Sequence, residues 1–182
     1  MRRFSFVAAI ALSLAVAFTV QSATQPTGKL HVPLGMSLAL KVPGQAAGKA
    51  AVVPTGRDVP IPAGKYEPAS LTCGAVAPQT KELWSIKVAA PNWGKLKEIS
   101  VAEKATTTLS AGPPFTLKTL IYRAENKPTG KVIPFTIRIF GKAGELYDYN
   151  TLKKGAATAP QVGFQLVNEK GTVLATGTLH YG

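Results

Sequence analysis

The chain has 182 residues, and its 21 lysines and arginines against 9 aspartates and glutamates give a formal net charge of +12. A single cysteine, Cys73, excludes an internal disulfide, so the folded chain must be stabilised by packing. The lysines form no run longer than Lys153-Lys154, which favours a role in solubility over specific nucleic-acid binding. Salt-sensitive association with an anionic glycan or cell-surface polymer is the alternative.

Residues 1–23 are predicted to form a cleavable secretory signal helix. Arg2 and Arg3 supply the charged start, and an apolar run follows until small residues near Ala23 offer a cleavage site. The run is shorter than the ~20 residues that a membrane-spanning helix needs, so we expect cleavage and no transmembrane anchor. Residues 24–182 would then form a single exported domain, periplasmic or extracellular, and the lack of an Asn-x-Ser/Thr sequon favours a bacterial source.

Short units of alternating apolar and polar residues, separated by proline and glycine, dominate residues 24–182. Residues 36–42 alternate as a half-buried strand does and stop at Pro43-Gly44, and a second run ends at Pro54. Cys73 is expected to be a small buried strand residue. The pattern predicts an all-β fold, an antiparallel immunoglobulin-like or transthyretin-like β-sandwich of about nine or ten strands.

One turn, Pro62-Ala63-Gly64-Lys65-Tyr66, is more specific than the rest of the pattern. It resembles the turn of exported β-sandwich modules of the carboxypeptidase-regulatory-like and transthyretin-like families. In those modules the glycine makes the corner and the aromatic ring closes the edge of the sandwich. The resemblance implies a fold and brings no catalytic or ligand-binding residue.

The two tryptophans are predicted to have different environments. Trp84 shares one face of a strand over residues 82–89 with other apolar residues, so we expect it in the core. Trp93 lies in a loop beside Lys95 and Lys97, and these three residues are the candidate ligand-binding site, where a ring could stack on a sugar beside positive charge. The alternative is a tryptophan folded back over the end of the sandwich. After this loop, residues 95–104 are interpreted as a strand, with a short helix as the competitor.

The C-terminal part continues the strand pattern. Residues 132–140 place Phe135, Ile137 and Ile139 inward, and a final hairpin turns through residues 168–171, where asparagine and glycine tolerate positive φ.

No motif marks a reactive centre. The acidic and aromatic run 145–150 could offer oxygens to Ca²⁺, but it lacks the spacing of a calcium loop and is interpreted as a solvated strand end. His31 and His180 could meet only if the first and last strands pair. The sequence therefore nominates no catalytic residue, no metal and no cofactor, and it predicts no oligomeric state.

Two functional hypotheses follow. The first is an exported non-enzymatic β-sandwich, a structural or binding module of the cell envelope or extracellular matrix. The second is a small exported hydrolase or lyase, or the accessory domain of an enzyme, whose site no motif marks.

Overall fold

The computed structural model describes residues 26–42, 49–128, 130–132 and 134–179. This part of the chain forms seventeen strands and one 3-10 helix, so the protein is all-β, with more and shorter strands than expected. Over these residues no helix has both the length and the apolar character needed to cross a membrane. The predicted signal helix, His180, and residues 43–48 lie outside the described residues.

A three-stranded sheet is built around the first strand. Its central strand pairs antiparallel with one neighbour and parallel with the other. In spatial order the strands are β4 (Asp58–Pro62), β1 (Thr27–His31) and β9 (Thr106–Thr108). A separate antiparallel pair joins β5 (Gly64–Tyr66) to β8 (Ile99–Val101).

The largest sheet has antiparallel neighbours throughout. Its strands, in spatial order, are β10 (Thr116–Ile121), β13 (Phe135–Phe140), β14 (Leu146–Lys154), β7 (Leu83–Val88), β6 (Pro68–Val76), β2 (Met36–Lys41) and β3 (Ala50–Val53), with β15 (Ala157–Thr158) against β14. Two hairpins stand apart: β11 (Glu125–Lys127) with β12 (Gly130–Val132), and β16 (Gly163–Val167) with β17 (Val173–Thr178).

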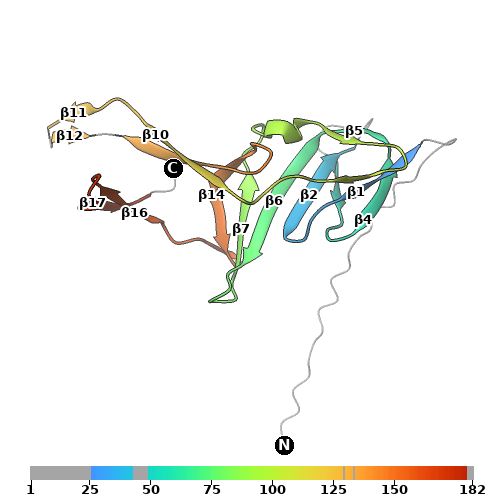
Figure 1. The fold of residues 1–182 in the computed structure, drawn as a ribbon, viewed down its shortest axis with the longest axis horizontal. Helices are drawn as coiled ribbons and strands as arrows, with labels where there is room; N and C mark the ends of the chain where they lie inside the picture. The colour runs from blue at the N-terminus through green and yellow to red at the C-terminus, as the bar shows by residue number, and fades with distance from the viewer. Residues whose placement is uncertain (1–25, 43–48, 129, 133, 180–182) are drawn as a thin grey trace, which may run out of the picture.

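The strands divide between two ends of the molecule (Figure 1). The strands from β1 to β7, blue to green, lie together at one end, whereas β10, β11, β12, β16 and β17 lie at the other, with β14 between them. Since β14 pairs with both β7 and β13, it joins the two ends through one continuous sheet.

The main core lies at the first of these ends. Side chains of the three-stranded sheet pack against those of β2, β3 and β6 in one buried cluster, whose members of lowest exposure are Leu30, Val32, Leu38 and Leu71. A second, smaller cluster of Cys73, Ile86 and Tyr147 lies where β6, β7 and β14 meet. Cys73 is thus a buried strand residue, as predicted.

The proline and glycine turn before β5 is closed by its tyrosine. Tyr66 is buried in the main core, and its hydroxyl donates a hydrogen bond of 2.7 Å to the carbonyl oxygen of Pro62. A buried phenol needs such a partner, and a backbone carbonyl at the start of the turn supplies it. The ring therefore holds the turn against the core.

Two local predictions were wrong in part. Residues 95–104 form no continuous strand: a 3-10 helix, Gly94–Lys97, precedes the short strand β8. Trp84 is only half-buried, and the Nζ atom of Lys154 lies 5.9 Å from its ring centroid. The pairing of first and last strands, which the sequence left open, is not found among the described residues, because β1 pairs with β4 and β9 and β17 pairs with β16.

Candidate functional site

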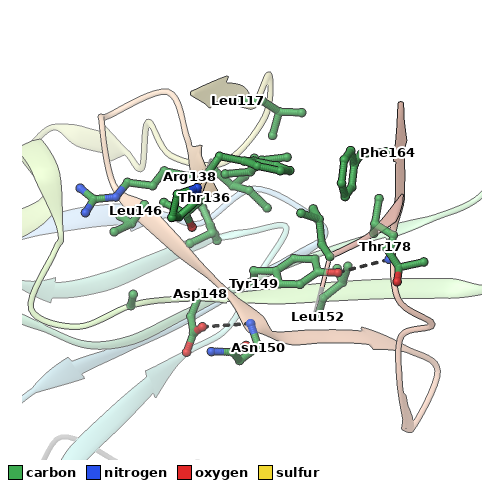
Figure 2. Close-up of a pocket in the computed structure, with 18 residues that line it drawn as sticks. Leu117, Thr136, Arg138, Leu146, Asp148, Tyr149, Asn150, Leu152, Phe164 and Thr178 are labelled. Carbon is green, nitrogen blue, oxygen red and sulfur yellow. Dashed lines mark hydrogen bonds between the residues drawn. The ribbon is translucent and has the colours of Figure 1, made fainter. Parts of the chain in front are cut away.

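A groove separates β13 and β14 from the C-terminal hairpin (Figure 2). Its volume is about 840 Å³, and most of the side chains lining it are apolar. The apolar lining comes from four strands and the segments beside them, and includes Leu117, Phe135, Ile137, Ile139, Leu152, Val162, Phe164 and Leu179. Concave surfaces of this size and composition are typical of ligand sites.

The strand β13 forms one wall of the groove. Phe135, Ile137 and Ile139 alternate along the strand and line the groove, but each is only half-buried, whereas the sequence predicted that they point into a closed interior. The opposite wall is Phe164 of β16, whose ring meets that of Phe135 edge-on with centroids 4.9 Å apart. The groove is therefore the partly filled space between two layers of strands.

Polar contacts hold one side of the groove in place. The phenolic oxygen of Tyr149 accepts a hydrogen bond of 3.3 Å from the backbone N–H of Val162, which ties β14 to the segment leading into the hairpin. The carboxylate of Asp148 accepts a 3.0 Å bond from the N–H of Asn150, at a point where β14 shifts register. Figure 2 shows the charged ends of Arg138 and Asp148 turned away from Phe164, so neither of these two charges faces that ring.

A buried hydrogen-bond network lies beside the groove and supports β14. Glu145 is fully buried, and its carboxylate accepts hydrogen bonds from the N–H groups of Gly112 (2.6 Å) and Ala143 (2.8 Å) and from the hydroxyl of Tyr147 (3.0 Å). The sequence interpretation of Glu145 as part of a solvated strand end was wrong. The two backbone donors come from the chain just before β10 and from the turn before β14, and no local pattern reveals that they converge.

Tyr147 extends this network to the only cysteine. Its hydroxyl oxygen lies 3.0 Å from the Sγ atom of Cys73. Burial is the main cause that raises the pKa of Tyr147 far above its ordinary value of 10.0, and contacts with Cys73 and Glu145 raise it further. Burial also raises the pKa of the Cys73 thiol above 9.0. Both groups are therefore neutral at physiological pH, and the thiol is a packed and unreactive group.

The predicted ligand-binding residues lie at a different place from the groove. Trp93 is 8 % exposed and belongs to the main core, so its ring is folded back over the strands and is not a surface platform. Lys95 and Lys97 are exposed on the 3-10 helix that follows. The N–H of Lys95 donates to the carbonyl oxygen of Ala143 at 2.9 Å, so this loop is bound to the turn that precedes Glu145.

A polar cluster on the three-stranded sheet was not anticipated. The Nδ1 atom of His31 lies 2.9 Å from Oδ1 of Asp58, and the hydroxyl of Thr106 donates to Oδ2 of the same carboxylate at 3.2 Å. Chiefly through the His31 hydrogen bond, the pKa of Asp58 falls below its ordinary value of 3.8. The side chains of His31 and Asp58 are 33 % and 43 % exposed. Strand pairing places Asp58 opposite His31 and Thr106 opposite Lys29, two residues before His31, so only knowledge of the register could have found the cluster.

Among the residues that the structure describes, no group of three or more histidine, cysteine, aspartate or glutamate side chains could hold a metal ion. The fold and the groove together define an all-β protein with an open apolar site near its C-terminal hairpin. No protein-family model matches the chain, and neither a curated protein nor a solved structure shows significant similarity to it.

Proposed function

We propose that this chain is an exported β-sandwich that functions by binding, as a structural or binding module of the cell envelope or extracellular matrix. The proposed binding site is the groove between β13, β14 and the hairpin β16–β17. The observation that carries the proposal is the groove itself: about 840 Å³ of open space bordered by half-buried and exposed apolar side chains. Contact of these side chains with an apolar partner would remove them from water, which is the dominant favourable term in association.

The surroundings of the groove support binding of an apolar group. Phe164 and Phe135 form an aromatic pair across it, and Leu117, at the edge strand β10, is 66 % exposed. Large apolar side chains gathered on one surface of a folded chain are typical of an interaction site. The alternative function, a small exported hydrolase or lyase, would need ionisable groups turned toward the ligand, and Arg138 and Asp148 point away from Phe164 (Figure 2).

An uncharged solvatochromic dye, Nile red, tests this proposal. We expect the purified protein to bind the dye with a blue shift of its emission, and Phe164→Ser to weaken the binding about tenfold, because an aromatic wall of the groove is lost. The matched control is Leu174→Ser, which removes an exposed apolar side chain from the same hairpin outside the groove lining. Equal affinities for both variants would reject the groove as the site.

Association with a polyanion is the separate electrostatic part of the proposal. It is supported by the net charge of +12 and by exposed lysines such as Lys95 and Lys97. Retention on a sulfated polysaccharide resin should fall steeply with salt, and Lys95→Gln with Lys97→Gln should lower the eluting salt concentration. Retention that does not depend on salt would end this part of the proposal without bearing on the groove.

A further inference from the structure

The strand β10 is an exposed edge of the largest sheet that carries several apolar residues and only one charge. Among the strand pairings of the described residues, β10 pairs on one side only, with β13, and all six of its residues are exposed. Leu117 is 66 % exposed and Ile121 is 72 % exposed. Natural proteins protect such edges with charge, proline or a covering segment, because an open apolar edge pairs readily with another strand. Lys118 is the single charged residue of β10.

The backbone of β10 presents a regular set of free groups along this edge. The N–H of Tyr122, the residue after the strand, donates to the carbonyl oxygen of Pro134 at 2.9 Å, in the same register that pairs Leu120 with Thr136. The backbone N–H and C=O groups of successive residues point to opposite sides of an antiparallel strand, so those of the even-numbered residues of β10 point toward β13. The N–H and C=O groups of Leu117, Thr119 and Ile121 therefore point away from the sheet.

We propose that two copies of this chain pair β10 against β10, antiparallel, across a two-fold axis at Thr119. Such an interface is isologous, and an axis perpendicular to the sheet places one residue opposite itself. Only an axis at Lys118 or at Thr119 lets the two copies of β10 overlap along nearly their whole length. An axis at Lys118 would place two ammonium groups directly opposite each other, which is unfavourable.

An axis at Thr119 gives complementary neighbours instead. Leu117 of each copy then lies opposite Ile121 of the other, and the two Thr119 side chains lie opposite each other. Apolar pairs and threonine pairs are both favourable across neighbouring strands. Lys118 lies opposite Leu120 of the second copy, so like charges are not paired across the interface. The Nζ atom of Lys118 already lies 5.2 Å from the centroid of the Phe140 ring of its own chain.

The pairing would extend the largest sheet from one copy into the next. Leu117 and Ile121 are in register with Ile139 and Phe135, which line the groove, so the apolar faces of the two copies would become continuous. Variants at Thr119 test the pairing apart from the proposed groove ligand, because Thr119, unlike Leu117, does not line the groove. Residues 113–179 carry nine basic and four acidic side chains, so long-range repulsion opposes the dimer and we expect added salt to strengthen it.

Sedimentation equilibrium of the purified protein, with the same N-terminus in every variant, tests the pairing. We expect the wild type to dimerise and Thr119→Pro to raise the dimer dissociation constant at least about tenfold, because it removes two symmetry-related N–H donors. Proline is tolerated there within the monomer, since this N–H faces away from β13. Thr119→Val keeps the N–H and should dimerise as the wild type does.

Covalent trapping provides a second measurement that tests the register. At the two-fold axis, Thr119→Cys should form a disulfide-linked dimer under a mild copper–phenanthroline oxidant, whereas Lys118→Cys should not, because residue 118 faces residue 120 of the second copy. Cys73 is buried and does not compete. A wild type that stays monomeric to millimolar concentration would overturn the inference, and so would a dimer unaffected by Thr119→Pro or equal cross-linking of both cysteine variants.

Discussion

The two ends of this protein use apolar residues in opposite ways. Of the 21 buried hydrophobic residues in the described part of the chain, 18 precede Gly112, and only Ala143, Tyr147 and Ala159 follow it. Of the fifteen exposed large hydrophobics, eleven lie from Phe115 onward. Both ends are strands of similar composition, so the pattern along a strand does not decide whether its apolar face is covered. Coverage depends on whether a second layer lies over that face.

The largest expected effect comes from removing the buried carboxylate that supports β14, the strand that joins the two ends. Glu145→Ala leaves the N–H groups of Gly112 and Ala143 buried without an acceptor, and we expect a loss of about 4 kcal/mol in the free energy of unfolding. Urea denaturation followed by circular dichroism measures it. Glu145→Gln keeps one acceptor oxygen and should lose less, while Glu169→Ala, in the exposed hairpin loop, should be near neutral. A loss below about 1 kcal/mol for Glu145→Ala would contradict the role of the network.

A matched pair of leucines tests the comparison directly. Leu71→Ala, in β6 at 1 % exposure, should cost about 3 kcal/mol in the free energy of unfolding through lost transfer energy and a cavity. Leu174→Ala, in β17 at 61 % exposure, should change it by less than about 0.5 kcal/mol. A similar loss of unfolding free energy for both variants in dilute solution would show that the Leu174 side chain is covered in the isolated chain. The two ends would then not differ in how they bury apolar residues.

The smallest expected effect concerns pH at the first end. The pKa of Asp58 is depressed below 3.8 mainly by the hydrogen bond to His31, so its ionised form stabilises the fold above that pH. This contribution is lost as pH falls through the depressed pKa. Asp58→Asn should therefore be slightly less stable than the wild type at pH 7, and the difference should shrink as the pH falls below 3.8. Denaturant midpoints at pH 7, 5 and 3 measure it, and a difference that grows on acidification would contradict the assignment.

The sequence predicted what depends on short-range pattern. The strand over residues 36–42 forms as β2, Met36–Lys41, because period-two alternation and a proline–glycine stop are local properties. The last hairpin forms around residues 168–171, where Gly171 has φ of 79° and the Asn168 side chain accepts bonds from the N–H groups of Lys170 and Thr172. These turns need no distant partner.

What the sequence could not predict depends on distant partners. Trp84 is less buried than predicted because it lies near the start of β7, beside Lys154. Trp93 adopts the folded-back alternative because its loop packs onto the main core. Glu145 is buried because donors 33 and 2 residues away converge on it. The groove arises because the hairpin β16–β17 stands away from β13. The alternation of residues within β13 is the same at any distance of the hairpin, so the sequence does not reveal the groove.

The bend at Gly94 fixes the shape of the corner that carries the exposed side chains of Lys95 and Lys97. Gly94 has φ of 57°, and a Cβ atom there would come within 2.5 Å of the carbonyl oxygen of Ala143 and of the carbon of Gly144. In a saturation library selected for folded protein, this codon should accept glycine alone, while the codons for Lys95 and Lys97 should accept many residues. The charge of this corner can therefore change from one variant to another without any change in its shape.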